Sequence, residues 1–240
     1  MPRFFVEKIP GSQAVISGPD AKHISRVLRM RVGETITLCD QQGYDYSGVV
    51  SELSNTSVLV NITGKYPSKS EPSVCVHLFQ AMPKSDKMEW IVQKSVELGV
   101  SEITPVFTKR CVSRPDEKSM QKKLERYQKI SLEAAKQSGR ACVPVVHKAV
   151  PLQEALSQMQ ESILSLCFYE RAELPLKDTM SGAFQSVSIL IGSEGGFEEW
   201  EAEQANEAGC RLVSLGPRIL RCETAPLAAL SAIMYASGNL

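Results

Sequence analysis

The chain has 240 residues, of which 27 are basic, 27 are acidic and 43% are hydrophobic, so its formal net charge at pH 7 is zero. This composition is ordinary for a globular protein, and the length suits one large domain or two small ones. No apolar run is long enough to span a bilayer, and the first residues lack the apolar region of a signal peptide, so we expect a cytoplasmic protein without a membrane partner.

The neutral total hides an uneven distribution of charge. Residues 1–32 and 84–148 carry net charges of +4 and +6, whereas residues 33–83 and 149–240 carry −3 and −7. Local basic surfaces are what contacts with nucleic acid phosphates require. Solvated surface lysines explain the same blocks equally well, so charge alone leaves both interpretations open.

The first seventy residues predict a small β-barrel with one helix. Short β-rich segments, separated by turn residues, are expected at residues 3–6, 35–40, 46–51 and 57–63. The helix begins at Pro19 and Asp20, and Ile24, Val27 and Leu28 follow its spacing. Residues 64–73 are polar with two prolines, which indicates a linker.

Strands alternate with helices from residue 74 onwards. We expect strands at residues 74–81, 102–107, 144–147, 163–168, 187–191 and 212–215. We expect helices at residues 85–98, 118–138, 152–159 and 198–208, and a final helix from about residue 224. This alternation predicts an α/β fold with a mainly parallel sheet, and such sheets bind ligands at the carboxyl ends of their strands.

The first of two glycine-marked turns, residues 191–197, directly follows a predicted strand. Gly192, Gly195 and Gly196 permit positive φ angles and a close approach of the backbone to a ligand. The next helix opens with Glu198 and further glutamates, which would repel a phosphate, and neither a P-loop lysine nor a GxGxxG motif is present. The turn therefore predicts a ligand without phosphate, although a simple strand-to-helix turn is the alternative.

The second turn, residues 215–225, leads into a nearly all-apolar helix that we expect to be buried in the core or in a subunit interface. Arg218, Arg221 and Glu223 stand at its entrance. Charged groups at such a place need a partner or a task, so either a reactive site or an Arg–Glu pair that caps the helix fits the pattern.

Cysteine and histidine spacing gives no metal signature. The seven cysteines include no CxxC pair, and the three histidines are far apart in the sequence. We therefore expect buried, reduced thiols and no metal site.

The segments IGSEGGF and LGPRILRCETA together resemble the paired signature of the SPOUT class of RNA methyltransferases. Within that class the chain is similar to the family of ribosomal RNA small subunit methyltransferase E, the 16S rRNA uracil-N3 methyltransferases. Further similar segments follow in the same order along the chain. They are His23 with residues 27–29 (VLR), residues 94–99 (KSVELG) and residues 133–140 (EAAKQSGR). Ser193 and Lys136 depart from the commonest pattern, which has proline and glutamate there.

The resemblance implies a small N-terminal PUA-like β-barrel domain for RNA binding at residues 1–70. It also implies a SPOUT methyltransferase domain with a trefoil knot at residues 74–240, and a homodimer with the last helix in the interface. The implied cofactor is S-adenosyl-L-methionine, with no metal. Its expected contacts are Phe168, Tyr169, Glu170, Ile191, Gly192, Glu194, Gly195, Gly196, Leu215, Gly216, Ile219, Leu220 and Arg221.

The implied reaction is methylation of N3 of a specific uridine in 16S rRNA, either free or within the small ribosomal subunit, which forms 3-methyluridine. Arg221 is our first choice to stabilise the uracil anion, and Arg140, from the partner subunit, is the second. Glu223 is expected either to accept the N3 proton or to orient an arginine. The residues expected to contact RNA are Arg3, Lys22, Arg26, Arg29, Lys84, Lys87, Arg126, Gln137 and Arg140.

Two further expectations concern basic residues on two helix faces and the alternative functions of the protein. Lys22, Arg26 and Arg29 are spaced as one face of the first helix, and Arg126 and Arg140 belong to a similar series on the long helix. The alternatives are a SPOUT methyltransferase that acts on tRNA or on a ribose 2′-OH, and a non-catalytic RNA-binding assembly protein.

Overall fold

The computed structural model describes residues 2–6, 9, 11–180 and 184–240, and it divides the chain into two compact units. The N-terminal unit comprises Met1–Glu71 and Ala135–Val143, and the C-terminal unit comprises Pro72–Ala134 and Pro144–Leu240. In the part of the chain that the structure describes, no helix has the length and apolar character needed to cross a membrane.

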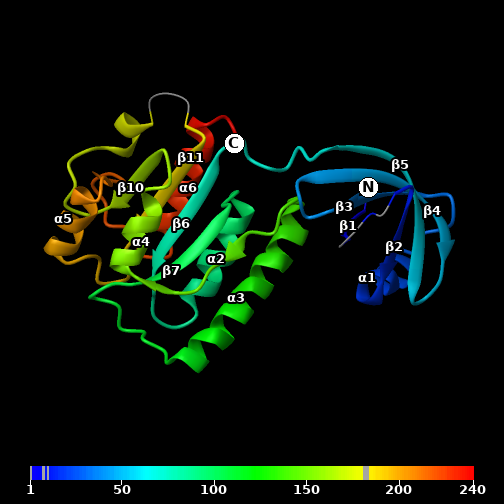
Figure 1. Ribbon diagram of the computed structural model, residues 1–240, viewed down its shortest axis with the longest axis horizontal. Helices are drawn as coiled ribbons and strands as arrows, with labels where there is room; N and C mark the ends of the chain where they lie inside the picture. The colour runs from blue at the N-terminus through cyan, green and yellow to red at the C-terminus, as the bar shows by residue number, and fades with distance from the viewer. Residues whose placement is uncertain (1, 7–8, 10, 181–183) are drawn as a thin grey trace. The chain divides into compact units, whose positions relative to one another are not determined.

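The N-terminal unit contains a five-stranded sheet in the order β1-β3-β4-β5-β2. Its strands are β1 (Arg3–Phe5), β2 (Gln13–Ser17), β3 (Thr35–Cys39), β4 (Tyr44–Leu53) and β5 (Ser57–Pro67). Only β1 and β3 are parallel. The sheet curls over a core that includes Ile16, Ile36 and Val60 (Figure 1). Among the described residues β1 and β2 do not pair, so the predicted barrel is an open half-barrel, and β2 was not predicted.

The predicted N-terminal helix is shorter and less regular than its sequence spacing indicated. The α-helix α1 covers Gly18–Lys22 and continues as the π-helix η1, His23–Val27. Arg29 lies beyond the helix with a positive φ of 53°. A π-helical turn is wider than an α-helical one, so the prediction that Lys22, Arg26 and Arg29 share one α-helical face is wrong.

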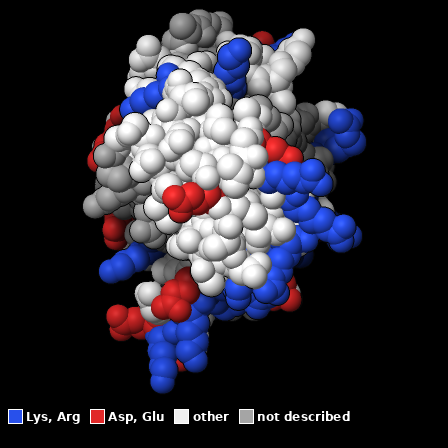
Figure 2. Space-filling model, turned by 90° about the vertical axis from the view of Figure 1, so that its right-hand side faces the viewer, with Lys and Arg blue, Asp and Glu red and all other residues white. Residues whose placement is uncertain are grey.

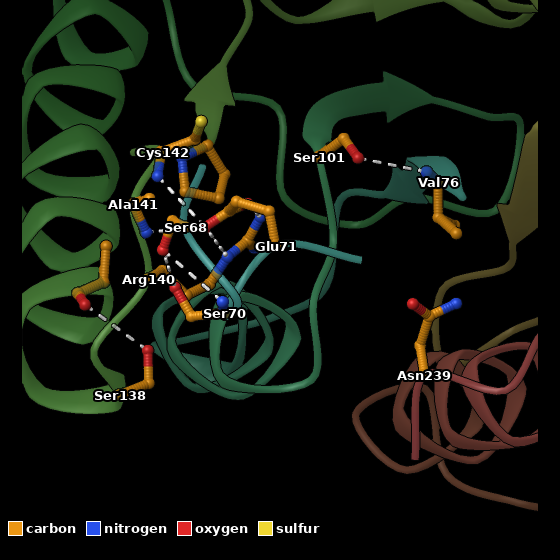
Figure 3. A network of polar contacts seen from close by, with 12 residues as sticks. Ser68, Ser70, Glu71, Val76, Ser101, Ser138, Arg140, Ala141, Cys142 and Asn239 are labelled. Atoms are coloured by element: carbon orange, nitrogen blue, oxygen red, sulfur yellow. Dashed lines mark hydrogen bonds and ion pairs between the residues drawn. The ribbon is translucent and has the colours of Figure 1, made fainter. Parts of the chain in front are cut away.

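Glu71 joins the two separate chain segments of the N-terminal unit (Figure 3). Its Oε2 lies 2.7 Å from a guanidinium nitrogen of Arg140, and its Oε1 accepts hydrogen bonds from the backbone N–H groups of Ala141, at 2.6 Å, and Cys142, at 3.1 Å. Cys39 adds a bond from its thiol to the carbonyl oxygen of Ala141 at 3.2 Å. We call this arrangement the Glu71 clasp.

The C-terminal unit contains a parallel sheet in the order β12-β10-β11-β6-β7-β8, with β9 also paired to β7 (Figure 1). Its strands are β6 (Cys75–Ala81), β7 (Glu102–Phe107), β8 (Val145–Val146), β9 (Val150–Pro151), β10 (Leu164–Phe168), β11 (Ser186–Ile191) and β12 (Arg211–Val213). The predicted parallel α/β architecture is therefore confirmed, and only the two-residue β9 was missed.

Helices follow most of these strands. They are α2 (Lys87–Glu97), α3 (Glu117–Ser138, whose last residues belong to the N-terminal unit), α4 (Leu152–Met159), the 3-10 helix η2 (Leu176–Thr179), α5 (Glu199–Glu207) and α6 (Ala225–Ala236). Side chains of α4 and α5 share one core cluster with Phe79 and Leu190 of the sheet, whereas α6 packs against α2, β6 and β11. Since the strands are parallel, the loops that follow β10, β11 and β12 gather at one edge of the sheet.

Candidate active site

A cleft of about 930 Å³ lies where β10, β11 and β12 end. Its size is in the range of small-molecule sites, which measure roughly 300–1,000 Å³. All thirteen residues that the resemblance assigned to the cofactor line it, and they come from residues 168–170, 191–196 and 215–221. Lys87 and Ser193 also line it. The two glycine-marked turns therefore form the walls of one cavity.

The first turn is closed by its own backbone. The N–H of Gly196 donates to the carbonyl oxygen of Ser193 at 3.0 Å, and Gly196 has a positive φ of 67°. A Cβ on Gly192 would lie 3.1 Å from the Cα of Gly196 and 3.3 Å from the Phe197 ring. Gly192 is therefore required by close packing and Gly196 by its backbone conformation.

Side chains from other elements hold this turn from outside. Arg110 donates to the carbonyl oxygen of Gly195 at 2.8 Å and to Glu198 at 2.9 Å. The Gln80 amide, fully buried at the end of β6, donates to the carbonyl oxygen of Gly192 at 3.2 Å. Arg110 was not predicted, because nothing in the sequence places residue 110 beside residue 195 before the sheet is built.

The acidic start of α5 is satisfied within the protein. Glu201 is buried, and its carboxylate accepts hydrogen bonds from the backbone N–H groups of Glu198, at 2.9 Å, and Lys109, at 2.7 Å. The Glu198 side chain pairs with Arg110. Two carboxylates thus occupy the place where a phosphate would interact with the helix N-terminus, which agrees with the predicted preference for a ligand without phosphate.

Lys87 at the start of α2 connects the two turns. Its ammonium lies 3.1 Å from Glu194 in the first turn and 3.0 Å from Glu223 in the second. Hydrogen bonds to Glu223 and then Glu194 raise the pKa of Lys87 above its usual value, so this lysine is a cation at all physiological pH values. We call these three residues the Lys87 bridge.

Both carboxylates of the Lys87 bridge have lowered pKa values. Burial alone would raise the pKa of each, but backbone N–H groups and Lys87 outweigh burial at Glu194 and Glu223. The Cys222 thiol also donates to Glu223 at 3.2 Å, and burial with that bond raises the pKa of Cys222 to about 12. A carboxylate held in its charged form is a weak proton acceptor, and Glu223 pairs with a lysine rather than with the expected arginine.

The two predicted catalytic arginines have different environments. Arg221 is exposed in the cleft wall, and among the described residues its guanidinium has no ion-pair partner. Arg140 has a side chain only 5% exposed, and it belongs to the Glu71 clasp of the other unit. This geometry favours a structural role for Arg140 over the predicted contact with uracil.

The chemistry of the cleft suits a ligand with a flat apolar part and a positive charge. Phe168, Ile191 and Leu220 contribute apolar surface, and the carboxylates of Glu170, Glu173 and Glu194 contribute negative charge. The buried hydroxyl of Ser193 has no hydrogen-bond partner among the residues that the structure describes, so it is available to a ligand. S-adenosyl-L-methionine, which has an adenine ring and a sulfonium, fits this set of groups.

Comparison with known proteins identifies the family. The RNA methyltransferase domain family matches residues 70–234, and the RNA methyltransferase PUA domain family matches residues 16–63. The chain is 37% identical over 227 residues to ribosomal RNA small subunit methyltransferase E of Bacillus subtilis, which covers 92% of this chain and 89% of the relative. The chain belongs to the ribosomal RNA small subunit methyltransferase E family.

Solved structures agree with this membership. A ribosomal RNA small subunit methyltransferase E from Neisseria gonorrhoeae, bound to S-adenosyl methionine, is 34% identical with a TM-score of 0.85, and the match covers 98% of this chain and 97% of that one. A methyltransferase from Legionella pneumophila in complex with the same cofactor is 32% identical with a TM-score of 0.82, over 98% and 97% of the two chains. The resemblance seen in the sequence is confirmed, as is the PUA domain.

Most of the side chains that we predicted to contact RNA are exposed. They are Lys22, Arg26, Arg29, Lys84, Arg126 and Gln137. Figure 2 shows that blue Lys and Arg side chains gather in clusters on the face in view, while much of the remaining surface is uncharged. Some of the predicted contacts also have partners within the protein: Arg3 pairs with Asp45 and Arg126 with Glu89, each at 2.6 Å, and Lys87 forms its bridge.

Proposed function

We propose that this protein transfers a methyl group from S-adenosyl-L-methionine to N3 of a uridine in 16S rRNA of the small ribosomal subunit, forming 3-methyluridine. The observation that carries the proposal is the single cleft walled by both glycine-marked turns. Membership of the rRNA methyltransferase family supports the reaction class, and the relatives with bound cofactor support the ligand.

The thirteen cleft residues named above are the proposed cofactor contacts. Bound S-adenosyl-L-methionine supplies a methyl group that its sulfonium already activates. The backbone of residues 191–196 lines the cleft, and its glycines let the turn close tightly: a Cβ on Gly192 would meet Gly196, and a Cβ on Gly196 would meet the Glu170 carboxylate. The apolar walls exclude water from the ring, and Glu194, fixed by Lys87, keeps negative charge near the bound cation.

Arg221 is the proposed catalytic residue at the uracil. Uridine N3 is a poor nucleophile while it carries a proton, so the site must favour the deprotonated base. A guanidinium beside the uracil carbonyls stabilises the developing negative charge, and Arg221 is in the cleft wall without an internal ion-pair partner among the described residues. Correct placement of N3 can lower the barrier by a further 7–11 kcal/mol or so in favourable cases.

Glu223 is assigned to positioning rather than to proton transfer. Its lowered pKa makes it a weak base, and its contact with Lys87 holds the second turn to α2. The N3 proton therefore leaves to solvent in this proposal.

The two parts of the chain divide the work of RNA recognition. We assign RNA binding to a PUA-like domain of residues 1–70, and methyl transfer with further RNA contacts to residues 74–240. The exposed Lys22, Arg26, Arg29, Lys84, Arg126 and Gln137 are the proposed contacts to rRNA. Phosphate contacts from such side chains position an RNA without reading its sequence.

A trefoil knot and a homodimer belong to the same proposal. After the edge strand β12 the chain returns through residues 214–224 to α6, which packs on β6, β11 and α2, a route consistent with a knot. Ile219 is 88% exposed and Tyr235 on α6 is 77% exposed. In the proposed dimer, which the family resemblance implies, a second copy of the chain covers the last helix and its exposed Tyr235. Sedimentation at micromolar concentration tests it, and a monomer would contradict it.

Two experiments test the function. Calorimetry with S-adenosyl-L-methionine is expected to give one site per chain. Incubation with small ribosomal subunits that lack the modification is expected to yield 3-methyluridine in 16S rRNA by mass spectrometry. A methylated tRNA, or a methyl group on a ribose 2′-OH, would show that the enzyme acts on another RNA or on another acceptor atom. A folded protein that binds no cofactor would instead be an RNA-binding assembly protein, and the proposal would fail.

A further inference from the structure

A second hollow, of about 750 Å³, lies at the other end of the C-terminal sheet, where β6, β7 and β11 begin. It is lined by the first residues of these strands, by His147 and Lys148 just after β8, and by Glu154, Gln158 and Glu161 on and just after α4. Because the strands are parallel, this hollow and the methyltransferase cleft occupy opposite edges of the sheet. The proposed methyl transfer makes no use of it.

Three potential metal ligands meet in this hollow, although they are far apart in the sequence. His77 is on β6 and pairs in register with Glu102 on β7. His147 follows β8, where its backbone N–H donates to the carbonyl oxygen of Ile103 at 2.8 Å. One ligand atom from each of the three side chains lies within 4.8 Å of the other two. The expectation from spacing that the histidines form no cluster is therefore wrong for His77 and His147.

The sheet holds the His77 ring in place. Its Nε2 forms a 2.8 Å hydrogen bond with the hydroxyl of Thr104, which is fully buried, and the ring stacks on Phe79 at a centroid distance of 4.0 Å. A partner on one ring nitrogen is the usual arrangement in a metal-binding histidine, because it fixes the tautomer and leaves the other nitrogen for the ion. Ser101, next to Glu102, accepts a bond from the N–H of Val76 at 3.1 Å, which ties the starts of β6 and β7 together (Figure 3).

The other two ligands are more accessible. His147 Nε2 lies 2.6 Å from a carboxylate oxygen of Glu102, and their side chains are 40% and 48% exposed. The rings of His77 and His147 are 5.5 Å apart between centroids. Glu154 and Glu161 add negative charge to the lining, against the single lysine Lys148 among the described lining residues. An ion can thus enter from solvent and find two imidazoles, one carboxylate and a local excess of negative charge.

We propose that His77, Glu102 and His147 bind a divalent transition-metal ion, with Zn²⁺ as the probe. Two imidazoles and a carboxylate are a known zinc donor set, and a water completes the coordination. On binding, the hydrogen bond between His147 and Glu102 opens, and any proton it holds passes to solvent. The ion joins β6, β7 and the segment after β8, so it stabilises the folded chain over the unfolded one.

Titration of the metal-stripped, full-length protein with Zn²⁺ tests the proposal. Calorimetry is expected to show one site per chain, and the Tm is expected to rise with added Zn²⁺. Glu102→Gln and His147→Gln change exposed side chains of similar size, so the fold is retained, and each is expected to weaken Zn²⁺ binding at least about 100-fold. Thr104→Val removes only the hydrogen-bond partner of the His77 ring and is expected to weaken Zn²⁺ binding about tenfold.

Matched control variants distinguish this site from non-specific zinc binding. Glu161→Gln and Cys75→Ser change the same hollow outside the three ligands and are expected to leave the affinity within about threefold of wild type. Co²⁺ in place of Zn²⁺ is expected to give a visible spectrum that His147→Gln abolishes. If Glu102→Gln and His147→Gln bind Zn²⁺ as tightly as wild type, the metal is an adventitious ion only and the proposal is overturned. Absence of binding by the folded wild-type protein overturns it too.

Discussion

The two glycine-marked turns line one cleft, yet they are held in different ways. The first, residues 191–197, is fixed by its own backbone bond, by Arg110 and by the buried Gln80. The second, residues 215–225, is largely exposed at its centre, where Ile219 reaches 88%. Near its end Glu223 contacts Lys87 at the start of α2. One wall is therefore preorganised, and the other is free to adapt to a ligand or a partner.

If the second turn supplies chemistry while the first supplies binding, Arg221→Ala should give the largest effect. We expect a loss of roughly 100- to 1,000-fold in kcat for methyl transfer, because a donor to the developing anion is removed. Cofactor affinity should fall much less than kcat, because Arg221 is only one of the thirteen proposed cofactor contacts. The measurement is single-turnover methylation of small subunits, with calorimetry alongside.

Arg218→Ala is the matched control for Arg221, since both arginines are exposed in the same turn. It is expected to lower kcat by less than about tenfold. Equal losses from the two variants would mean that the turn contributes only general positive charge, and the catalytic assignment of Arg221 would be wrong.

Gly192→Ala tests the rigidity of the first turn. The new methyl group would meet backbone atoms of Gly196 at 3.1 Å, so we expect a loss of about 1–3 kcal/mol in the free energy of unfolding. Cofactor affinity should also fall at least tenfold. Chemical denaturation and calorimetry measure these effects.

Gly216→Ala provides the comparison in the second turn. Gly216 has a φ of 101°, but no atom of the described residues lies within 4 Å of an added Cβ, so only conformational strain of about 1 kcal/mol is expected. A Gly216→Ala variant that is less stable than Gly192→Ala would reverse our ranking of the two turns.

Lys87→Met removes a side chain that contacts both turns. Glu194 and Glu223 then lose their common cation, and we expect cofactor affinity to fall about fivefold, because the bridge is partly exposed. Lys84→Met is the control, since its side chain is exposed and only its backbone N–H contacts Glu194. If Lys87→Met and wild type bind the cofactor with equal affinity, the Lys87 bridge does not contribute to cofactor binding.

The smallest expected effect is a dependence on pH. The pKa values of Glu194 and Glu223 are lowered in the folded protein from 4.5. Their contribution to stability is therefore fully present above about pH 4.5 and is lost as the pH falls through the lowered values. Thermal unfolding between pH 6 and pH 3.5 should decline less steeply in Lys87→Met than in wild type. Parallel declines in the two proteins would contradict this.

Sequence reasoning was accurate where a local pattern decides the structure. The strand at 102–107 and the helix at 152–159 were predicted to the residue, because each is a clear run bounded by turn residues. The strand β2 was missed although Ala14 and Ile16 alternate with exposed residues. The π-helix could not be foreseen, since the 3.6-residue spacing of Ile24 and Leu28 predicts an α-helix.

Contacts across long stretches of sequence were beyond such reasoning. Arg110 contacts Gly195 at one end of the parallel sheet, and the His77 ring lies beside the His147 ring at the other end. In each pair the two residues come together only because parallel strands of one sheet bring them to the same end. The cleft residues were found in advance because the glycines and the charged turn are themselves a signature. The Lys87 bridge had no such signal, and Lys87 was assigned to RNA instead.

The Glu71 clasp has a consequence for how this chain could be cut or recombined. Residues 135–143 interrupt the C-terminal unit and belong to the N-terminal one, where Glu71 accepts bonds from Arg140, Ala141 and Cys142. The polypeptide thus passes between the units three times. A fragment that begins at residue 72 would carry a nine-residue segment, residues 135–143, separated from the unit to which it belongs and from Glu71. Exchange of the N-terminal unit between relatives therefore requires two grafted pieces, and a single crossover would leave the clasp half made.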